Sequence, residues 1–512
     1  MQRTQFLPLS CRLLSGPPGC GKTTLLRTIS LGVVGRHLLA APRTQLLDEH
    51  AEELRVSARV RGLGIPITAT HSRQPEFGTV ERRARDALAS YGPADHAIVL
   101  VTHEMLLGLD PVLLRGWHVG IDEVPETAVV SGRFSATTTW SSLERHYVLL
   151  PSEHPGWWQA TPHPGVEALT RREITAGDPK LASFHTVAQC STRQVYVDVA
   201  DWEEARHPKR PVRWWSAWTP MELAGCASVT ITGASFRSSL LYHASRHLHG
   251  GALRFEFVDV GAGEPRAKPR IRVHYFTRHP GSTDWWETDA GSLCLVRISE
   301  HLARVGFAGY WSANKAARPY FRHRLGGQWV EPKQAGSNAL RHHTSCCLIY
   351  SSKAQQDDEP ILEVLGLDRE AIKLTREYED VLQFVLRGAV RNADYGGNYD
   401  VYVYDELQAA ALRDKLLATG ITDRIELIAV EEAGIMDVTR LGTSPPPATI
   451  TPDARSLRER SEEKKVAERE RGRLRRAAEK AKRQAEGTHR GVGRPRKAES
   501  MPSEPAGSPY SP

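Results

Sequence analysis

The chain lacks long hydrophobic runs, an export signal and paired cysteines. None of its apolar segments approaches the roughly 20 residues that a membrane-spanning helix needs. The opening residues, MQRTQFLPLSCRLLSG, have neither the apolar core nor the cleavage site of a signal peptide. Its seven cysteines include no CxxC pair, which excludes the common zinc and redox motifs. We therefore expect a cytoplasmic protein with free thiols and no membrane partner.

Most of the chain also lacks net charge. Of the 67 Lys and Arg residues, 17 lie between Asp453 and Pro512, beside 10 of the 60 Asp and Glu residues. The net charge of +7 therefore belongs to this segment, and the rest of the chain is neutral. Such a basic segment is typical of an arm that binds polyanions such as nucleic acid, or of a solvated tail that aids solubility.

The length and the order of segments predict several compact units. At 512 residues the chain exceeds the roughly 100 to 200 residues of one domain. Strand-like apolar runs alternate with amphipathic stretches in two series, which predicts α/β domains with parallel sheets and helices on both faces. The expected units are the first part of an α/β domain (1–127), a Trp-rich insertion (128–227), the end of the first domain with a linker (228–260), a second α/β domain (261–441), and a Pro-rich linker with a basic charged tail (442–512).

Short apolar runs mark the expected strands. In the first series they are CRLLSG, HLLAAP, IVLVTH and WHVGIDE. In the second they are SVTITGAS, FEFVDV, RVHYF, SLCLVRI, VGFAGYW, TSCCLIYS, YDVYVYD and IELIAV. The tail segment SLRERSEEKKVAERERGRLRRAAEKAKRQAE has a helix-forming composition but almost no apolar face. We expect it to be an isolated charged helix or disordered.

The motif GPPGCGKTT, which ends at Thr24, is typical of a loop that binds a nucleotide triphosphate. An apolar strand precedes it and an apolar helix follows it. Its glycines permit a tight loop whose amides, with the helix N-terminus, face an anion. Lys22 is expected to reach the β- and γ-phosphates of ATP, and the hydroxyl of Thr23 to hold Mg²⁺. The other expected ATP-binding residues of the loop are Gly16, Gly19, Cys20, Gly21 and Thr24.

The run WHVGIDE places two acids, Asp122 and Glu123, at the end of an apolar strand. ATP hydrolysis needs one carboxylate for Mg²⁺ and another that positions or deprotonates the attacking water. We assign the first role to Asp122 and the second to Glu123. The two motifs together predict an ATPase.

These motifs and the segments around them resemble superfamily 2 helicases of the DEAD/DEAH type, among them DNA-acting relatives from phages and mobile elements. The resemblance extends from Leu13 to Val430, and the sequence DEVP, Asp122 to Pro125, stands where the family has its DExx box. It implies two RecA-like domains, ATP hydrolysis in the cleft between them, and a nucleic-acid partner. The fifteen residues before the loop leave little room for the adenine-reading glutamine motif of DEAD-box RNA helicases, which favours DNA.

The same resemblance implies nucleic-acid contacts and a coupling motif. HLLAAPRTQLL, IVLVTHEML and KQAGSNAL are similar to family motifs that contact nucleic acid, and ITGASF resembles the Ser-Ala-Thr motif that links hydrolysis to strand movement. The implied nucleic-acid contacts are Arg43, Thr44, Thr102, His103, Gly336 and Asn338. The implied coupling residues are Gly233, Ala234 and Ser235.

LQFVLRGAVRNADYGG resembles the Gln-x-x-Gly-Arg-x-x-Arg motif of the second domain. The resemblance implies that Gln383 binds the nucleotide and that Arg387 or Arg391 is the arginine finger. Leu386 replaces the glycine of the motif. The two arginines, four residues apart, are expected one turn apart on one helix face. The alternative is a pair of salt-bridged helix arginines.

Two further features leave alternatives open. GVGRPRK in the tail resembles an AT-hook, whose Arg-Pro-Arg core lies in the minor groove of DNA, with Arg494 and Arg496 as contacts. The alternative is a basic low-complexity segment. Tryptophan pairs such as Trp214-Trp215 either stack on exposed bases or fill a core.

The leading interpretation is an ATP-dependent helicase or translocase that acts on DNA, with ATP and Mg²⁺ as ligands. Replication or recombination proteins are further expected partners. One alternative is a P-loop DNA-packaging ATPase, which should add a nuclease domain, for which the chain after Leu441 has no room. Another is a non-motor ATP switch that binds DNA and uses the nucleotide only to change shape.

Overall fold

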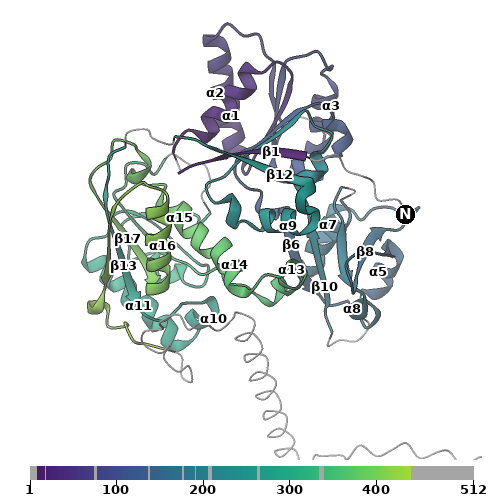
Figure 1. Ribbon diagram of the computed structural model, residues 1–512. Helices are drawn as coiled ribbons and strands as arrows, with labels where there is room; N and C mark the ends of the chain where they lie inside the picture. The colour runs from purple at the N-terminus through teal and green to yellow at the C-terminus, as the bar shows by residue number, and fades with distance from the viewer. Residues whose placement is uncertain are drawn as a thin grey trace, which may run out of the picture. The chain divides into compact units, whose positions relative to one another are not determined.

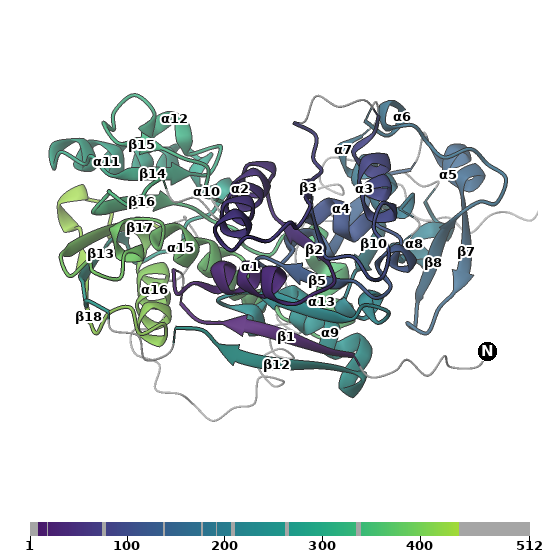
Figure 2. The same cartoon turned by 90° about the horizontal axis from the view of Figure 1, so that it is seen from above.

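The computed structural model describes residues 9–17, 19–73, 78–136, 139–175, 178–190, 192–205, 210–261, 266–333 and 339–439. They belong to one compact unit, Met1–Leu441. Their strands form two parallel sheets and one antiparallel sheet, and Figures 1 and 2 show the elements in two views. Within these ranges no helix is both long and apolar enough to cross a membrane.

The first sheet is parallel, with the strand order β12-β1-β11-β5-β2-β4-β3. Its strands are β1 (Leu9–Ser15), β2 (Arg36–Ala41), β3 (Ile67–Ala69), β4 (Ala97–Thr102), β5 (His118–Ile121), β11 (Ser228–Thr232) and β12 (Leu253–Asp259). Because β1, β11 and β5 are neighbours, the loops that follow them open at one carboxyl edge. That edge carries the GPPGCGKTT loop, the acid pair (Asp122 and Glu123) and the GAS segment (Gly233 to Ser235).

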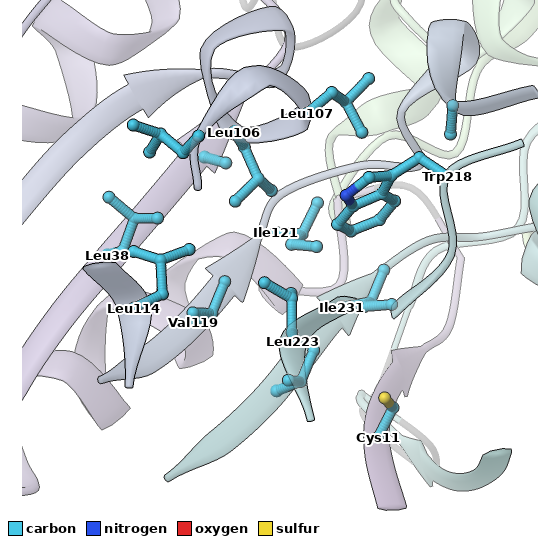
Figure 3. Close-up of a cluster of buried hydrophobic side chains, with 14 of the residues drawn as sticks. Cys11, Leu38, Leu106, Leu107, Leu114, Val119, Ile121, Trp218, Leu223 and Ile231 are labelled. Atoms are coloured by element: carbon cyan, nitrogen blue, oxygen red, sulfur yellow. The ribbon is translucent and has the colours of Figure 1, made fainter. Parts of the chain in front are cut away.

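Helices cover both faces of this sheet, since parallel strands are normally buried on both sides. The helices are α1 (Lys22–Gly32), α2 (Thr44–Val60), α3 (Val80–Ala89), α4 (His103–Gly108) and α9 (Leu240–His249). On one face Leu26 of α1 and Leu54 of α2 belong to the same buried cluster as Leu39. On the other face Leu106 of α4 lies in a second cluster with Ile121, shown in Figure 3. Each such buried side chain contributes about 1.5 to 3 kcal/mol.

The Trp-rich stretch between β5 and β11 forms the antiparallel sheet, with the strand order β6-β10-β9-β8-β7. Its elements are β6 (Val129–Phe134), α5 (Trp140–His146), β7 (Tyr147–Pro151), β8 (Trp157–Pro162), α6 (Arg171–Thr175), α7 (Pro179–Ala188), β9 (Val195–Asp198), α8 (Val199–Glu203) and β10 (Val212–Ala217). Trp214 and Trp215 are 2% and 1% exposed. The Trp215 ring stacks on Tyr196 with 4.5 Å between centroids. Of the two alternatives for this pair, the structure supports core packing and not base stacking.

The second parallel sheet has the strand order β15-β14-β16-β17-β13-β18. Its strands are β13 (Arg270–Thr277), β14 (Tyr310–Ala313), β15 (Gln328–Trp329), β16 (Ser345–Ile349), β17 (Asn398–Asp405) and β18 (Arg424–Ala429). The helices between these strands are α10 (Thr283–Trp286), α11 (Asp289–Arg304), α12 (Arg318–Phe321), α13 (Glu359–Leu365), α14 (Arg369–Thr375), α15 (Glu377–Val385) and α16 (Glu406–Ala418). Of these, α13 packs against β6 and β10 of the antiparallel sheet. Helices α15 and α16 pack into the buried cluster on one face of the second parallel sheet, and α11 packs into the cluster on the other.

One predicted strand is wrong, because SLCLVRI lies inside α11. Its buried positions are Cys294, Leu295, Ile298 and, beyond the run, Leu302, a spacing that fits the 3.6-residue helical repeat. The hydroxyl of Thr288 caps the helix by accepting a hydrogen bond from the amide of Gly291. In VGFAGYW only the last two residues belong to a strand, β14.

The predicted α/β class with parallel sheets is confirmed, and the strand order is consistent with two RecA-like domains. The segment 228–260 contributes β11 and β12 to the first sheet. The expected domain limits stay a prediction. The Pro-rich linker and basic tail, 442–512, lie outside the described residues.

Candidate active site

The GPPGCGKTT loop joins β1 to α1 along a backbone path that favours glycine. φ is positive at Gly16, Gly19 and Gly21, and Gly21 immediately precedes α1. L-side chains rarely adopt this backbone region. At Gly19 space is also short, because a Cβ atom would lie 3.0 Å from the carbonyl oxygen of Arg391. This loop therefore lies close to the second α/β part, the part of the chain that contains the second parallel sheet.

Lys22, the first residue of α1, bends back over the loop. Its Nζ donates hydrogen bonds to the carbonyl oxygens of Gly16 (2.6 Å) and Pro17 (2.8 Å). Burial lowers the pKa of Lys22 below its ordinary value. The neighbouring Cys20 packs against Gly261. A Cβ atom added at Gly261 would lie 2.7 Å from the Cβ atom of Cys20. Lys22 thus places a desolvated cation at the helix N-terminus, where an anion is also favoured by the backbone amides.

Asp122 follows β5 and is buried among three side-chain donors. Its Oδ1 accepts hydrogen bonds from the hydroxyls of Thr23 (2.9 Å) and Thr232 (2.8 Å). Its Oδ2 lies 3.1 Å from Nε2 of His50. Burial alone would raise the pKa of Asp122, but His50 and the two hydroxyls outweigh it and lower the pKa. Asp122 is therefore a fixed, ionised carboxylate.

The oxygens of Asp122 and Thr23 fit Mg²⁺, a hard cation that prefers oxygen ligands. Proteins usually bind this ion through one or two carboxylates together with substrate phosphates. Within the described ranges no group of three or more His, Cys, Asp or Glu side chains is placed to hold a metal.

Glu123 is held in an unusual backbone conformation. It is the only described non-glycine residue with a positive φ, 67°, which costs roughly 1 to 2 kcal/mol. Its amide donates to Oγ1 of Thr232 at 2.9 Å, so that one hydroxyl contacts both acids. Burial raises the pKa of Glu123, and the opposing effect of Arg387 does not cancel this rise. A carboxylate with a raised pKa, aimed by backbone geometry, is suited to act as a general base.

The edge of the first sheet faces the second α/β part across a pocket of about 380 Å³. The predicted residues that line it are Gly19, Gly21, Lys22, Thr23, Thr24, Asp122, Glu123, Gly233, Ala234, Ser235, Gln383, Arg387 and Arg391. Gly16 and Cys20 belong to the same loop but do not line the pocket. The pocket therefore brings together residues that follow strands of the first sheet with residues on or after α15 in the second part.

Arginines make the second wall of the pocket strongly positive. Nη2 of Arg387 lies 3.7 Å from Oε1 of Glu123. The pKa of Arg391 is lowered to about 10, first by burial and then by repulsion from Arg387 and Arg341. Several guanidinium groups that repel one another favour a polyanionic ligand between them.

The prediction that Arg387 and Arg391 share one helix face is wrong. Helix α15 ends at Val385, and Arg391 belongs to the 3-10 helix η7 (Ala389–Arg391). The chain turns at Gly388, where a Cβ atom would lie 2.1 Å from the hydroxyl of Tyr399. The two arginines still reach the pocket, and they do so from two different elements.

Gln383 lies on the last turn of α15 and lines the pocket. Its Nε2 donates to Oε1 of Glu379 at 2.9 Å, and its Oε1 accepts from Nη2 of Arg387 at 3.5 Å. Gln383 therefore links Arg387 to α15.

The predicted nucleic-acid contacts lie in different surroundings. Arg43 and Thr44 are half-buried at the start of α2, and Glu123 is among the charges that act on Arg43. The Thr102 hydroxyl caps α4 by accepting from the amide of Met105. His103 is 4% exposed and its Nε2 lies 3.0 Å from the carbonyl oxygen of Asp122. The structure therefore does not support a nucleic-acid contact for His103, whose ring packs behind the acid. Gly336, Asn338, Arg494 and Arg496 lie outside the described residues.

Thr232, His50 and Arg341 are among the site residues that the sequence analysis did not identify. Thr232 ends a buried strand directly before the GAS segment. Its place in the sequence was therefore enough to identify it as a residue of the site. His50 lies on the buried face of α2 with Leu47 and Leu54, a spacing visible in the sequence. Its contact with Asp122 depends on tertiary structure. Arg341 carried no signal, since its place depends on the fold of the second part.

We expect Thr232→Val to slow turnover about 10- to 100-fold, the usual effect of removing a partner that orients a ligand-holding group. The valine keeps the size of the side chain but leaves the Glu123 amide without its acceptor and Asp122 with one donor fewer. Thr230→Val, on the same face of β11, is the matched control and should leave the turnover number nearly unchanged. Equal turnover of both variants would contradict a bridging role for the Thr232 hydroxyl.

Neither a known protein family nor a curated protein matches the chain. Solved structures that resemble it include an XPD helicase, with a TM-score of 0.46, 11% identity, and coverage of 82% of this chain and 96% of that one. Another is S. cerevisiae Dbp5 bound to RNA and ADP BeF3, with a TM-score of 0.35, 9% identity, and coverage of 83% and 87%. A third is the DUF1998 helicase MrfA bound to DNA and AMPPNP, with a TM-score of 0.35, 12% identity, and coverage of 83% and 50%.

Proposed function

We propose that the chain is an ATP-dependent nucleic-acid motor, a helicase or translocase, that hydrolyses Mg²⁺-ATP in the pocket between its two α/β parts. The observation that carries this proposal is the approach of Arg387 to Glu123. The acid follows a strand of the first sheet, and the arginine follows a helix of the second part. A hydrolytic site divided in this way responds to any relative movement of its two walls.

The proposed chemistry uses the contacts of both walls of the pocket: the loop and the acid pair on the first sheet, and Arg387 on the second part. The loop amides and Lys22 would bind the phosphates, while Thr23 and Asp122 would hold Mg²⁺, an ion that would supply charge neutralisation at the phosphate oxygens. Glu123 orients the attacking water and accepts its proton, as its raised pKa favours. Arg387 stabilises the charge that develops on the transferred phosphoryl group.

Coupling to nucleic acid uses the elements that leave the same edge of the sheet. Gly233, Ala234 and Ser235 line the pocket directly after Thr232, so this segment is placed to respond to a change around the nucleotide. Arg43 and Thr44 at the start of α2 are candidate contacts to the phosphate backbone of the nucleic acid. Arg494 and Arg496 of the basic tail add a proposed contact to DNA, which we favour over RNA.

The test compares Lys22→Ala with Lys315→Ala, an exposed lysine outside the lining of the pocket, in ATP turnover and in duplex unwinding. We expect Lys22→Ala to lower turnover by about 10²- to 10³-fold, because it removes a charge that stabilises the transition state. The control should match the wild type in both assays.

Unwinding or translocation assays with the wild type separate a motor from a simple switch. A motor displaces a strand in one direction and only with ATP, whereas a switch binds DNA without directional movement. Wild-type turnover that equals that of Lys22→Ala would contradict the assignment of the ATP site.

A further inference from the structure

His50 is a buried histidine at the edge of the pocket that the proposed chemistry leaves unused. It lies on α2, its side chain is 6% exposed, and its Nε2 is 3.1 Å from Oδ2 of Asp122. Leu47 and Leu54 flank it on the buried face of the same helix. Helix packing therefore fixes the ring relative to β5.

The hydrogen-bond partners of His50 determine which ring nitrogen carries the proton. An ionised carboxylate only accepts hydrogen bonds, so Nε2 must donate to Asp122. On the other side, Nη1 of Arg27 lies 3.1 Å from Nδ1 of His50. Since a guanidinium only donates, Nδ1 must accept. Arg27 is itself paired with Glu53. The side chains form one chain of contacts, Glu53 to Arg27 to His50 to Asp122.

This series of contacts from Glu53 to Asp122 engages one carboxylate oxygen of Asp122, Oδ2. It leaves the other, Oδ1, to face the proposed Mg²⁺ position. Oδ2 is held by His50, while Oδ1 meets the hydroxyls of Thr23 and Thr232. Without the imidazole the carboxylate could rotate about its Cβ–Cγ bond and lose its direction toward Thr23. Groups that orient metal-holding side chains in this way commonly change metal affinity 10- to 100-fold.

We propose that His50 is a positioning residue that aims Asp122 at the Mg²⁺ of a bound nucleotide, with Arg27 fixing its tautomer. The inference rests on the proposed function, because it concerns the Mg²⁺-ATP site of the same pocket. Helix α2 thereby has a role in Mg²⁺ affinity that is not evident from the phosphate-loop motif or from the acid pair.

The experiment measures binding of a fluorescent, non-hydrolysable ATP analogue to the full chain, once with Mg²⁺ and once with EDTA. The variants are His50→Ala and His50→Gln, whose amide can donate to Asp122 and accept from Arg27. The control is His96→Ala, which removes another histidine that contacts α1, through the carbonyl oxygen of Ser30 at 3.0 Å. His96 lies outside the lining of the pocket.

For His50→Ala we expect the Mg²⁺-dependent gain in affinity to fall about 10-fold or more, with affinity in EDTA changed less than about twofold. His50→Gln should recover most of the gain, and His96→Ala should behave as the wild type. A Mg²⁺ gain in His50→Ala equal to that of the wild type would overturn the inference. Equal losses with Mg²⁺ and EDTA that His50→Gln does not restore would also overturn it, because they indicate a structural role only. If the wild type itself gains nothing from Mg²⁺, the proposed function fails instead.

Discussion

Glu123→Gln is expected to lower the turnover number for ATP by about 10²- to 10⁴-fold, the range attributed to a positioned general base. The amide keeps the size of the side chain but cannot accept the proton of the attacking water. Nucleotide affinity should stay within a few-fold of the wild type, because Lys22, Thr23 and Asp122 are untouched. A nucleotide-binding assay beside steady-state turnover separates the two effects.

The control for this variant is Glu126→Gln, three residues further along the same loop. Glu126 also lines the pocket, but it pairs with Lys333 at 2.6 Å and has no contact with the acid pair. Its replacement should change turnover only slightly. If Glu123→Gln keeps wild-type turnover, Glu123 is not the base and the reaction uses another acceptor.

The pH dependence of the wild type should carry the same signature. Burial raises the pKa of Glu123 above its ordinary value of 4.5. The basic form exists above that raised pKa, so turnover should decline as the pH falls toward it, at a higher pH than an ordinary carboxylate would cause. The residual rate of Glu123→Gln should lack this decline.

Arg387→Ala is expected to have a comparable or larger effect, about 10³- to 10⁵-fold on the turnover number, as for arginine fingers in general. Arg387 is 3% exposed, and its guanidinium reaches Glu123. Under the proposed assignment, its replacement removes the charge that stabilises the transferred phosphoryl group. Arg387→Lys should recover only part of the rate, because an ammonium group lacks the planar, multidentate geometry of guanidinium.

Arg391→Ala is the matched comparison. Arg391 packs its backbone and Cγ against Gly19 of the phosphate loop, so its loss should weaken nucleotide binding more than the turnover number. Single-turnover hydrolysis, with each variant in saturating excess over ATP, distinguishes the two variants. A larger loss for Arg391→Ala than for Arg387→Ala would reverse the assignment of the arginine finger.

The local parts of the site were predictable from the sequence. The phosphate loop is defined by glycines at fixed spacing, and β5 by a short apolar run that ends in two acids. Neither requires knowledge of distant contacts. The same holds for the parallel sheets, whose buried strands are apolar runs bounded by polar turns.

The parts that the sequence did not reveal depend on residues outside the local run. SLCLVRI contains β-branched and apolar residues that suit a strand, while the signals for a helix, the Thr288 cap and the apolar repeat that continues to Leu302, lie outside the run. The path around Gly388 depends on Tyr399, a residue of β17, so the separate positions of Arg387 and Arg391 had no local signal. The contact of His50 with Asp122 had no local signal for the same reason, since the two residues lie 72 positions apart.

The most direct measurement of a motor at this pocket is steady-state ATP turnover by the full chain as single-stranded DNA or RNA is added. We expect turnover to rise to a plateau with increasing polynucleotide, more with DNA than with RNA, and to stay at background in Lys22→Ala. Turnover that is indifferent to both polynucleotides would contradict a nucleic-acid motor.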